Sequence, residues 1–265
     1  MKNSINEFSQ VPVVILCGGK GIVLNEKQSQ RQNKGLIQVQ EKPLFWWVMH
    51  HYAVHGATDF ILATGLQGER FGAALVAAGG KISSDDANCY VVTIASVSCR
   101  VRLVQTALDA TTGERLLACK PWLIKAEQFA LTYSDTLSDV DLGAEMRFHK
   151  NQKLVATLVA TKYPVRFRIL GMRHGETIVR AFAPRPVIDA ASINGGYYIF
   201  TKALWDDAYG LSRLVALENQ PLERLAAAGQ LAAFEHKGSW QHCDAERDLG
   251  ELEKLAQQLN SLVGS

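Results

Sequence analysis

The chain has 265 residues, of which 48% are hydrophobic and only 20% are charged, so it has enough apolar side chains for a sizeable core. Its net charge of +2 argues against nonspecific nucleic-acid binding and favours a small molecule or a protein as partner. No apolar run approaches the ~20 residues that a membrane-spanning helix needs, and the opening ten residues lack the apolar centre of a signal peptide. We therefore expect a cytoplasmic globular protein.

The first part of the chain alternates strands and helices. Residues 1–10 are expected to form a flexible tail, and residues 11–265 a single domain, because no linker or internal repeat interrupts them. This alternation predicts a wound parallel sheet. The predicted elements are a strand at Val11–Cys17, a helix at Pro43–His55 with Gly56 as its cap, a strand at Asp59–Thr64 and a helix at Gly68–Ala78.

The remainder continues the pattern with additional strands. Together the elements predict a three-layer α/β/α fold around a mixed, mostly parallel sheet with small inserted strands. The predicted strands are Cys89–Ser98, Arg100–Gln105, Phe129–Tyr133, Leu154–Thr161 and Leu231–Glu235, and the predicted helices are Gly113–Cys119, Leu142–His149, Pro221–Ala228 and Asp248–Leu262. A small meander is predicted for Arg166–Ala183 with a turn at His174–Gly175, and Ile193–Phe200 contains the turn "INGG" before an aromatic strand.

The five cysteines are scattered along the chain and form no Cys-x-x-Cys pair. This spacing disfavours both a disulfide framework and a zinc site. We expect buried thiols in a reducing compartment. The cysteines are Cys17, Cys89, Cys99, Cys119 and Cys243.

A glycine cluster follows the first predicted strand, in the segment "LCGGKG". Consecutive backbone N–H groups in such a turn can form an anion nest, and a helix that follows adds the positive end of its dipole. The segment is not a Walker loop, because no Gly-Lys-Ser/Thr follows, and it lacks the third glycine of the dinucleotide fingerprint. It is either a phosphate-binding loop or a glycine turn without a ligand.

Two carboxylates are candidate ligands of a hard cation. Asp135 directly follows the apolar strand "FALTY", and Asp244 lies in "SWQHCDAERD". Ligands bind beyond the carboxyl ends of strands in open α/β sheets, and Mg²⁺ prefers a few oxygen ligands. Asp135 is alternatively an Asx-turn or helix-capping residue, and Asp244 a helix-capping residue. If both are ligands, they must lie close together in space.

Three other segments carry polar groups with two possible meanings each. Lys34 is either a cation for phosphate groups or a solvated surface lysine. The segment "TTGERL" at Thr111–Leu116 is either a contact for the edge of a nucleotide or a capped helix start. "INGGYY" at Ile193–Tyr198 either holds sugar hydroxyls with Asn194 and bare backbone or forms a hairpin turn.

Taken in order, these segments resemble the sugar-1-phosphate nucleotidyltransferase family, and most closely its glucose-1-phosphate cytidylyltransferases. The resemblance extends from Val13 to about Leu252. The segments that carry it are "VILCGGKG", "KPLFWWVMHHYAVHGATDFILATG", "TTGERL", "LTYSDTLSDVDL", "FHKNQKLVATLVAT", "INGGYYIF" and "QPLERLAAAGQLAAFEHKGSWQHCDAERD".

The resemblance implies a Rossmann-like nucleotidyltransferase fold and the reaction of a nucleoside triphosphate with a sugar 1-phosphate to give a nucleotide sugar and pyrophosphate. It implies Mg²⁺ as cofactor, CTP as nucleotide, a homo-oligomer and a place in bacterial polysaccharide biosynthesis. It implies these roles: Cys17, Gly18, Gly19, Gly21, Thr112 and Arg115 at the nucleotide, Lys34 and Asp135 in catalysis, Asp135 and Asp244 at the metal, and Arg185, Asn194, Gly195 and Gly196 at the sugar phosphate.

The sequence departs from the family pattern mainly among its cations. The family's loop arginine, which grips the triphosphate, is replaced by Val23, and its Lys-Pro-Lys-Pro becomes Gln32–Gly35 with one lysine kept. The acidic neighbour of the sugar-phosphate cation is lost in Pro184–Pro186. Lys20, Arg31 and Lys34 are the cations near enough in sequence to compensate. Three interpretations remain: an active cytidylyltransferase-type enzyme, an impaired paralogue that binds nucleotide or a partner subunit without turnover, or an enzyme that transfers to another phosphate acceptor.

Overall fold

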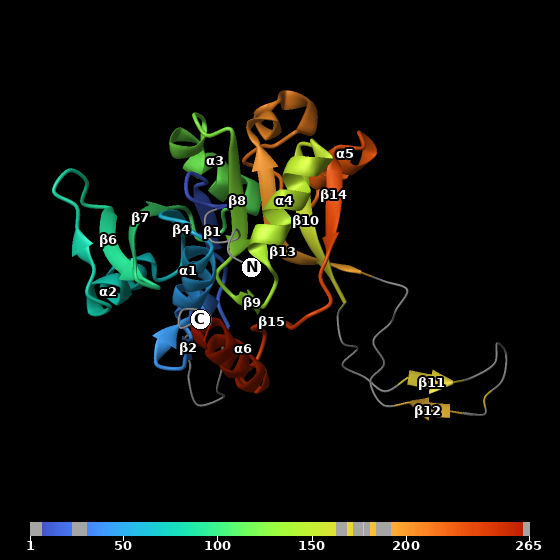
Figure 1. The fold of residues 1–265 in the computed structure, drawn as a ribbon, viewed down its shortest axis with the longest axis horizontal. Coiled ribbons are helices and arrows are strands. Elements are labelled where there is room, and N and C mark those ends of the chain that lie inside the picture. Colours follow the sequence, from blue (N-terminus) through green and yellow to red (C-terminus); the bar gives the residue numbers. More distant parts are fainter. Residues whose placement is uncertain are drawn as a thin grey trace.

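The computed structural model describes residues 7–22, 31–162, 169–171, 177, 181–183 and 192–261. Its centre is a nine-stranded sheet in the order β14-β10-β13-β8-β1-β4-β7-β6-β5 (Figure 1). Strands β13 and β6 run antiparallel to their neighbours β8, β10 and β7, whereas β1, β4, β7 and β8 are mutually parallel. The sheet strands are β1 Val13–Cys17, β4 Asp59–Thr64, β5 Lys81–Ile82, β6 Cys89–Ile94, β7 Val97–Gln105, β8 Gln128–Tyr133, β10 Ala156–Thr161, β13 Ile193–Thr201 and β14 Leu231–Glu235.

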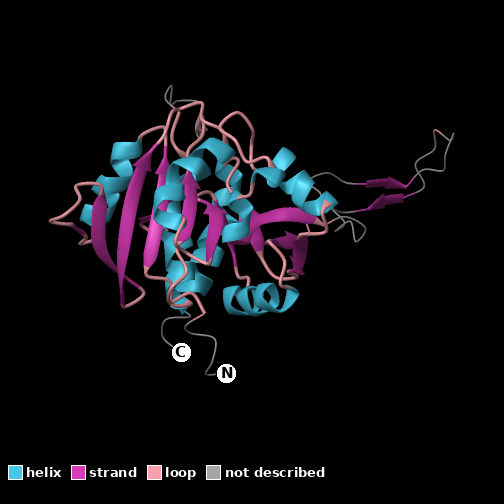
Figure 2. Ribbon diagram, turned by 90° about the horizontal axis from the view of Figure 1, so that it is seen from above, coloured by secondary structure: helices cyan, strands magenta, loops and turns pink. Residues whose placement is uncertain are grey.

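Helices cover both faces of this sheet, which gives the three layers that the sequence predicted (Figure 2). Successive residues of β1 alternate between two cores: Val13 and Ile15 belong to one, and Val14 and Leu16 to the other. The first core contains side chains of α1 Leu44–Val54, α2 Gly68–Ala77, α4 Leu142–Gln152 and α6 Leu249–Ser261, and the second contains side chains of α3 Thr112–Leu123 and α5 Gln220–Ala227.

Three small two-stranded sheets supplement the main one, as the expected inserted strands. They pair β2 Gln38–Val39 with β3 Lys42–Pro43, β9 Thr136–Ser138 with β15 Trp240–His242, and β11 Ile169–Gly171 with β12 Ala181–Ala183. The last pair belongs to the predicted meander, whose turn at His174–Gly175 lies outside the described residues.

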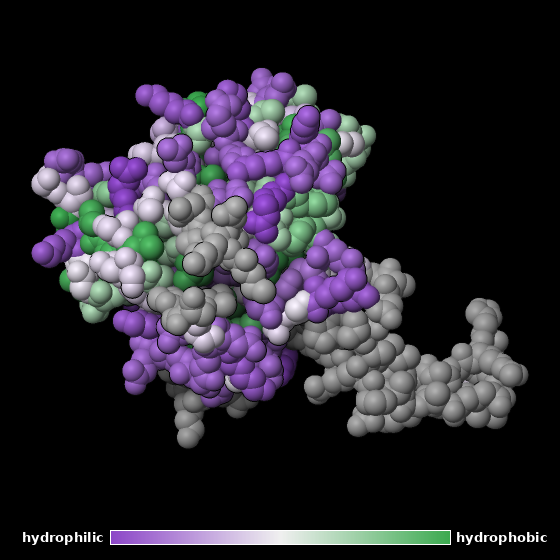
Figure 3. All heavy atoms as spheres, viewed as in Figure 1, coloured by the Kyte–Doolittle hydropathy of each residue, from purple (hydrophilic) through white to green (hydrophobic). Residues whose placement is uncertain are grey.

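The helices follow the amphipathic logic of their sequences. In α6, Leu252, Leu255, Ala256 and Leu259 are buried, and the spacing of these residues forms one face of a helix. The opposite face contributes to a hydrophilic surface around α6 (Figure 3). By contrast, α1 is buried from Leu44 to Ala53, so this stretch has no solvent-exposed face. None of the helices in the described part of the chain has the length and apolar content needed to span a membrane.

The structure corrects three details of the sequence prediction. Phe8 is fully buried and packs edge-on against Tyr52, so it belongs to the core and not to a tail. The hairpin between β6 and β7 turns at Ala95 and Ser96, not after Ser98. Finally, "INGG" is no turn, because all four residues lie in β13, where the pairing with β10 shifts register between Leu158 and Ala160.

One carboxyl group is buried in the first core without adequate compensation. Glu145, on α4, has 1% of its side chain exposed, and its Oε1 atom has no hydrogen-bond partner. Burial raises the pKa of this carboxyl from 4.5 to about 8. The native protein therefore keeps the proton of Glu145 in a pH range where the unfolded chain releases it.

We expect Glu145→Met to stabilise the protein in a pH-dependent manner. Between pH 4.5 and 8 the wild type should lose about 1.4 kcal/mol of unfolding free energy per pH unit through this group. The variant should thus gain ~4 kcal/mol over the wild type at pH 8 and less than ~1 kcal/mol at pH 5, in urea titrations. Glu69→Met on the exposed start of α2 serves as control. A gain that is the same at both pH values would contradict the assignment.

Candidate functional site

The parallel strands bring several polar segments to one edge of the sheet. β1, β4, β7 and β8 end at Cys17, Thr64, Gln105 and Tyr133, and their carboxyl ends share this edge. Two cavities of about 240 and 200 Å³ lie there and have Gly18, Gly19, Lys20 and Asp135 in common. The first is also lined by Leu16, Leu108, Asp109, Ala110, Thr112, Arg115 and Tyr133, and the second by Gly21, Asn33, Lys34 and Ser134.

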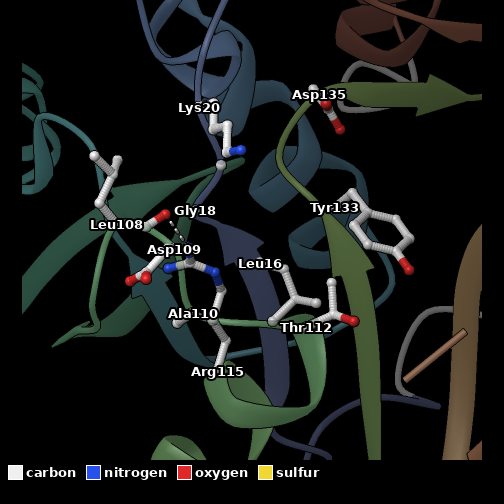
Figure 4. Close-up of a pocket in the computed structure, with 11 residues that line it drawn as sticks. Leu16, Gly18, Lys20, Leu108, Asp109, Ala110, Thr112, Arg115, Tyr133 and Asp135 are labelled. Atoms are coloured by element: carbon white, nitrogen blue, oxygen red, sulfur yellow. Dashed lines mark hydrogen bonds between the residues drawn. The ribbon is translucent and has the colours of Figure 1, made fainter. Parts of the chain in front are cut away.

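Arg115 supports the glycine turn at the first cavity (Figure 4). Its side chain is 3% exposed and donates hydrogen bonds to the carbonyls of Thr64 and Leu108, both at 3.2 Å, and to Thr106 Oγ1. A Cβ atom on Gly18 would lie 1.9 Å from Arg115 Cζ, so the guanidinium requires glycine at position 18. Burial lowers the pKa of Arg115. Arg115 therefore holds the loop in place, with most of its donors already used.

The segment "TTGERL" is a capped helix start, one of the two alternatives that the sequence left open. Thr111 is the N-cap of α3, and its hydroxyl accepts a hydrogen bond from Glu114 N at 3.0 Å. Thr112 lines the first cavity, but its hydroxyl donates to Glu218 Oε2 at 2.5 Å. Glu218 was not anticipated, because nothing in its local sequence marks it as close to the cavity.

Asn33 connects the second cavity to the sheet edge. Its Nδ2 atom donates to the carbonyls of Cys17 at 2.7 Å and Leu66 at 3.0 Å, and its Oδ1 accepts from Gly35 N at 2.9 Å. A Cβ atom on Gly35 would lie 2.6 Å from Ser134 Oγ. These contacts hold the one-turn 3₁₀ helix Lys34–Leu36 against both strand ends and so fix Lys34 at the cavity.

Lys34 joins the two carboxylates that the sequence predicted to meet. Its Nζ atom lies 2.9 Å from Asp244 Oδ1 and 3.5 Å from Asp135 Oδ2. Burial acts to lower the pKa of Lys34, but the charges and hydrogen bonds of Asp135 and Asp244 outweigh it, so the pKa is raised. The ammonium thus contacts both of the carboxylates that are candidate ligands of a hard cation.

His242 is a further member of this cluster that sequence reasoning did not select. Its Nε2 atom lies 3.1 Å from both Lys34 Nζ and Asp244 Oδ1 and 3.6 Å from Asp135 Oδ2. Its Nδ1 atom is 2.9 Å from Thr136 Oγ1, across the short β9–β15 sheet. In the sequence, only the location of His242 two residues before Asp244 pointed to it, and that location did not predict how its ring is oriented.

Within the described residues, no group of three or more His, Cys, Asp and Glu side chains is arranged to hold a metal ion. Asp135 and Asp244 nevertheless suit a hard cation, because both carboxylates already contact the same ammonium. Mg²⁺ commonly uses only one or two protein carboxylates, together with water and substrate phosphates. The donor set is therefore compatible with Mg²⁺ but would rely on oxygen atoms from a bound substrate.

The residues assigned to the sugar lie beside the first cavity without lining it. A Cβ atom on Gly196 would lie 2.8 Å from Tyr133 Cδ2, and Gly195 O accepts from Trp240 Nε1 at 2.7 Å. Asn194 Oδ1 accepts from Gly196 N at 3.0 Å, and its Nδ2 bonds to the Tyr198 hydroxyl. Gly196 and, through the Tyr198 hydroxyl, Asn194 thus connect to Tyr133, which lines the cavity and whose hydroxyl donates to Glu218.

For two other predicted site residues, Cys17 and Arg185, the structure does not place the side chain at either cavity. The Cys17 side chain is fully buried, donates to Ile15 O at 3.4 Å and lines neither cavity, so only its backbone is near the site. Burial raises the pKa of its thiol far above the usual value. Arg185, Val23 and Pro184 lie outside the described residues, so the sugar-phosphate cation and the loop substitution are not located.

Comparison with known proteins gives the class and then the family. Glucose-1-phosphate cytidylyltransferase of Salmonella typhimurium is 36% identical over 251 residues, which cover 91% of this chain and 94% of the relative. The probable glucose-1-phosphate cytidylyltransferase of Bacillus subtilis is 28% identical over 249 residues, covering 92% and 96%. No protein-family model matches the chain.

Solved structures agree on the fold. The inositol-1-phosphate CTP transferase of T. maritima superposes with a TM-score of 0.64 at 15% identity, covering 95% of this chain and 97% of that one. The α/β architecture with a mixed, mostly parallel sheet is therefore that of nucleotidyltransferases, as predicted. With the identity to the Salmonella enzyme over nearly its whole length, the chain belongs to the sugar-1-phosphate nucleotidyltransferase family.

Proposed function

We propose that this protein is an enzyme that transfers a cytidylyl group from CTP to a sugar 1-phosphate, with glucose 1-phosphate as the first acceptor to test. The acceptor's phosphate oxygen attacks the α-phosphorus in line and forms a new O–P bond. The bond from the α-phosphorus to the bridging oxygen breaks, and pyrophosphate leaves with its electron pair. Such reactions depend mainly on positioning and on neutralising charge, with little covalent chemistry by the protein.

One observation carries the proposal: Asp135 and Asp244 converge on a single cation beside a glycine-lined cavity, in a chain that matches a cytidylyltransferase along 91% of its length. Gly18, Gly19 and Gly21 would accommodate the phosphates, since glycine lets a ligand approach the backbone closely. Thr112 and Tyr133 would border the base and the sugar, respectively.

Mg²⁺ is proposed as cofactor, held by Asp135 and Asp244. When bound, it would supply positive charge to the phosphate oxygens during transfer. Lys34 would keep the two carboxylates at a fixed separation, because its ammonium contacts both. His242 would limit the movement of Asp244 through its own contact with that carboxylate.

The choice of CTP rests on the names of the two relatives, one a glucose-1-phosphate cytidylyltransferase and the other a probable one. We expect pyrophosphate release to be fastest with CTP when all four ribonucleoside triphosphates and dTTP are each supplied with Mg²⁺ and glucose 1-phosphate. The specificity constant for CTP should exceed that for each competitor by at least about tenfold, or ~1.4 kcal/mol.

The same assay separates the proposal from its rival. An impaired paralogue would bind a nucleotide, by calorimetry, yet release no pyrophosphate with any pair of nucleoside triphosphate and sugar 1-phosphate. Mannose, galactose and inositol 1-phosphates are added to the panel, so that an enzyme specific for an acceptor other than glucose 1-phosphate is not mistaken for an inactive protein. Turnover that is fastest with UTP or dTTP would remove the cytidylyl assignment while leaving the reaction class intact.

A further inference from the structure

We propose that the positive charge for the nucleotide's polyphosphate comes from Lys20 and Arg31, which flank the glycine turn, and not from Lys34. The inference builds on the proposed function, because it specifies how the same site binds its nucleotide. It follows from the ion pairs and hydrogen bonds that the cations around the two cavities already make.

Lys34 has little net charge to offer. Its ammonium is shared between Asp244 Oδ1 at 2.9 Å and Asp135 Oδ2 at 3.5 Å. Two carboxylates face one ammonium, so the cluster as a whole is negative at neutral pH. Without bound Mg²⁺, a polyphosphate placed next to it is repelled by the excess negative charge unless further cations are present.

Arg115 is not available either. It is 3% exposed, and its donors are directed to Thr64 O, Leu108 O and Thr106 Oγ1. Releasing them would break the three hydrogen bonds that hold a nearly fully buried guanidinium under the glycine turn, which is unfavourable. Its guanidinium also lies against Gly18 from below the loop, so it supports the backbone that a phosphate would contact.

Lys20 has the right position to contact a polyphosphate. It lies between Gly19 and Gly21, is exposed, and is the only Lys or Arg in the described part of the chain that lines both cavities. In Figure 4 its side chain extends along the rim of the first cavity, across from Asp135. Among the described residues it forms no ion pair with a carboxylate.

Arg31 is drawn to the same loop by the backbone. Ile22 and Gln32 exchange two hydrogen bonds of 2.9 Å, an isolated antiparallel bridge that places Arg31 opposite the glycine turn. The Arg31 Nη1 atom lies 3.3 Å from Lys20 O and 3.4 Å from Gly21 O. Within the described part of the chain, these contacts use one nitrogen of an exposed guanidinium, which leaves its remaining donors for an anion.

The test measures how affinity depends on the number of phosphates. Wild type, Lys20→Met, Arg31→Gln and Lys34→Met are titrated by calorimetry with CMP, CTP and inorganic tripolyphosphate. Arg70→Gln, on the exposed side of α2, is the matched control for loss of a positive charge. Thermal melts establish that each variant is folded, and Arg31→Lys examines whether charge alone restores binding.

We expect Lys20→Met and Arg31→Gln each to weaken CTP and tripolyphosphate about tenfold and CMP less than threefold, since only the longer ligands reach both cations. Lys34→Met should weaken tripolyphosphate less than either of these two variants does, and Arg70→Gln should have no effect. Equal losses for CMP and CTP, a loss confined to Lys34→Met, or no binding of tripolyphosphate to the wild type would each overturn the inference. Binding as expected without turnover on any substrate pair would instead contradict only the proposed function.

Discussion

Replacing Asp135 with asparagine is expected to lower pyrophosphate release by at least about 10³-fold. The amide keeps the size of the side chain but removes one of the two negative charges that face Lys34 and the proposed Mg²⁺ position. Removal of a single charge-stabilising group at such a site costs roughly 10²–10³ in rate, and loss of a metal ligand adds to that. Steady-state assays over a range of Mg²⁺ concentrations measure the effect.

Folding should survive this change, because 18% of the Asp135 side chain is exposed and asparagine keeps its size. Asp59→Asn is a suitable control. Asp59 pairs with Arg100 at the opposite, amino-terminal end of β4, and its loss should alter turnover less than threefold. If Asp135→Asn kept more than a tenth of the wild-type rate at every Mg²⁺ concentration, the site would have to lie elsewhere.

Gly21→Ala is expected to damage both folding and nucleotide binding. Gly21 has φ +65°, and an added Cβ would lie 2.5 Å from the carbonyl oxygen of Gln32, which accepts a hydrogen bond from Ile22 N. The left-handed conformation costs an alanine about 1–2 kcal/mol, and relief of the backbone clash adds a similar amount. We expect ~3 kcal/mol lower unfolding free energy, by urea titration, and at least tenfold weaker CTP binding.

Gly250→Ala provides the matched comparison for Gly21→Ala. Gly250 lies in the first turn of α6, and nothing lies within 4 Å of a Cβ added there. Alanine is the better helix former, so this variant should be neutral or slightly more stable and should bind CTP like the wild type. Normal CTP binding by a folded Gly21→Ala protein would show that the Ile22–Gln32 bridge and the loop that it closes do not shape the nucleotide site.

The sequence predicted the sheet and its helices because most of them have unambiguous local signals. Apolar β-branched runs such as Val13–Cys17 and Asp59–Thr64 are recognisable wherever they pack. The β6–β7 hairpin was placed wrongly because Ala95 and Ser96 both have positive φ, a conformation that usually calls for Asn or Gly. Neither alanine nor serine is typical of such a turn, so the residue types did not predict its position.

Sequence reasoning placed the residues that directly follow strands at the edge of the sheet, but it missed the interactions between distant parts of the chain. Asp135 and the glycine turn were located by the rule that ligands bind at the carboxyl ends of parallel strands. That Lys34 would form ion pairs with Asp135 and Asp244, or that Arg115 would lie beneath Gly18, depends on tertiary packing. Glu218 and His242 were missed for the same reason, since they reach the site from later segments of the chain.

The central claim is that this site joins a nucleotide to a sugar phosphate, and ³¹P NMR of a mixture of CTP, glucose 1-phosphate and Mg²⁺ tests it most directly. With wild-type protein, we expect the signals of both substrates to decline together. A pair of coupled diphosphate resonances from a nucleotide sugar should appear in equal amount with pyrophosphate, and Asp135→Asn protein should leave the spectrum nearly unchanged. Substrate signals that persist with folded, CTP-binding wild-type protein, or CTP consumed without a nucleotide-sugar signal, would contradict the account.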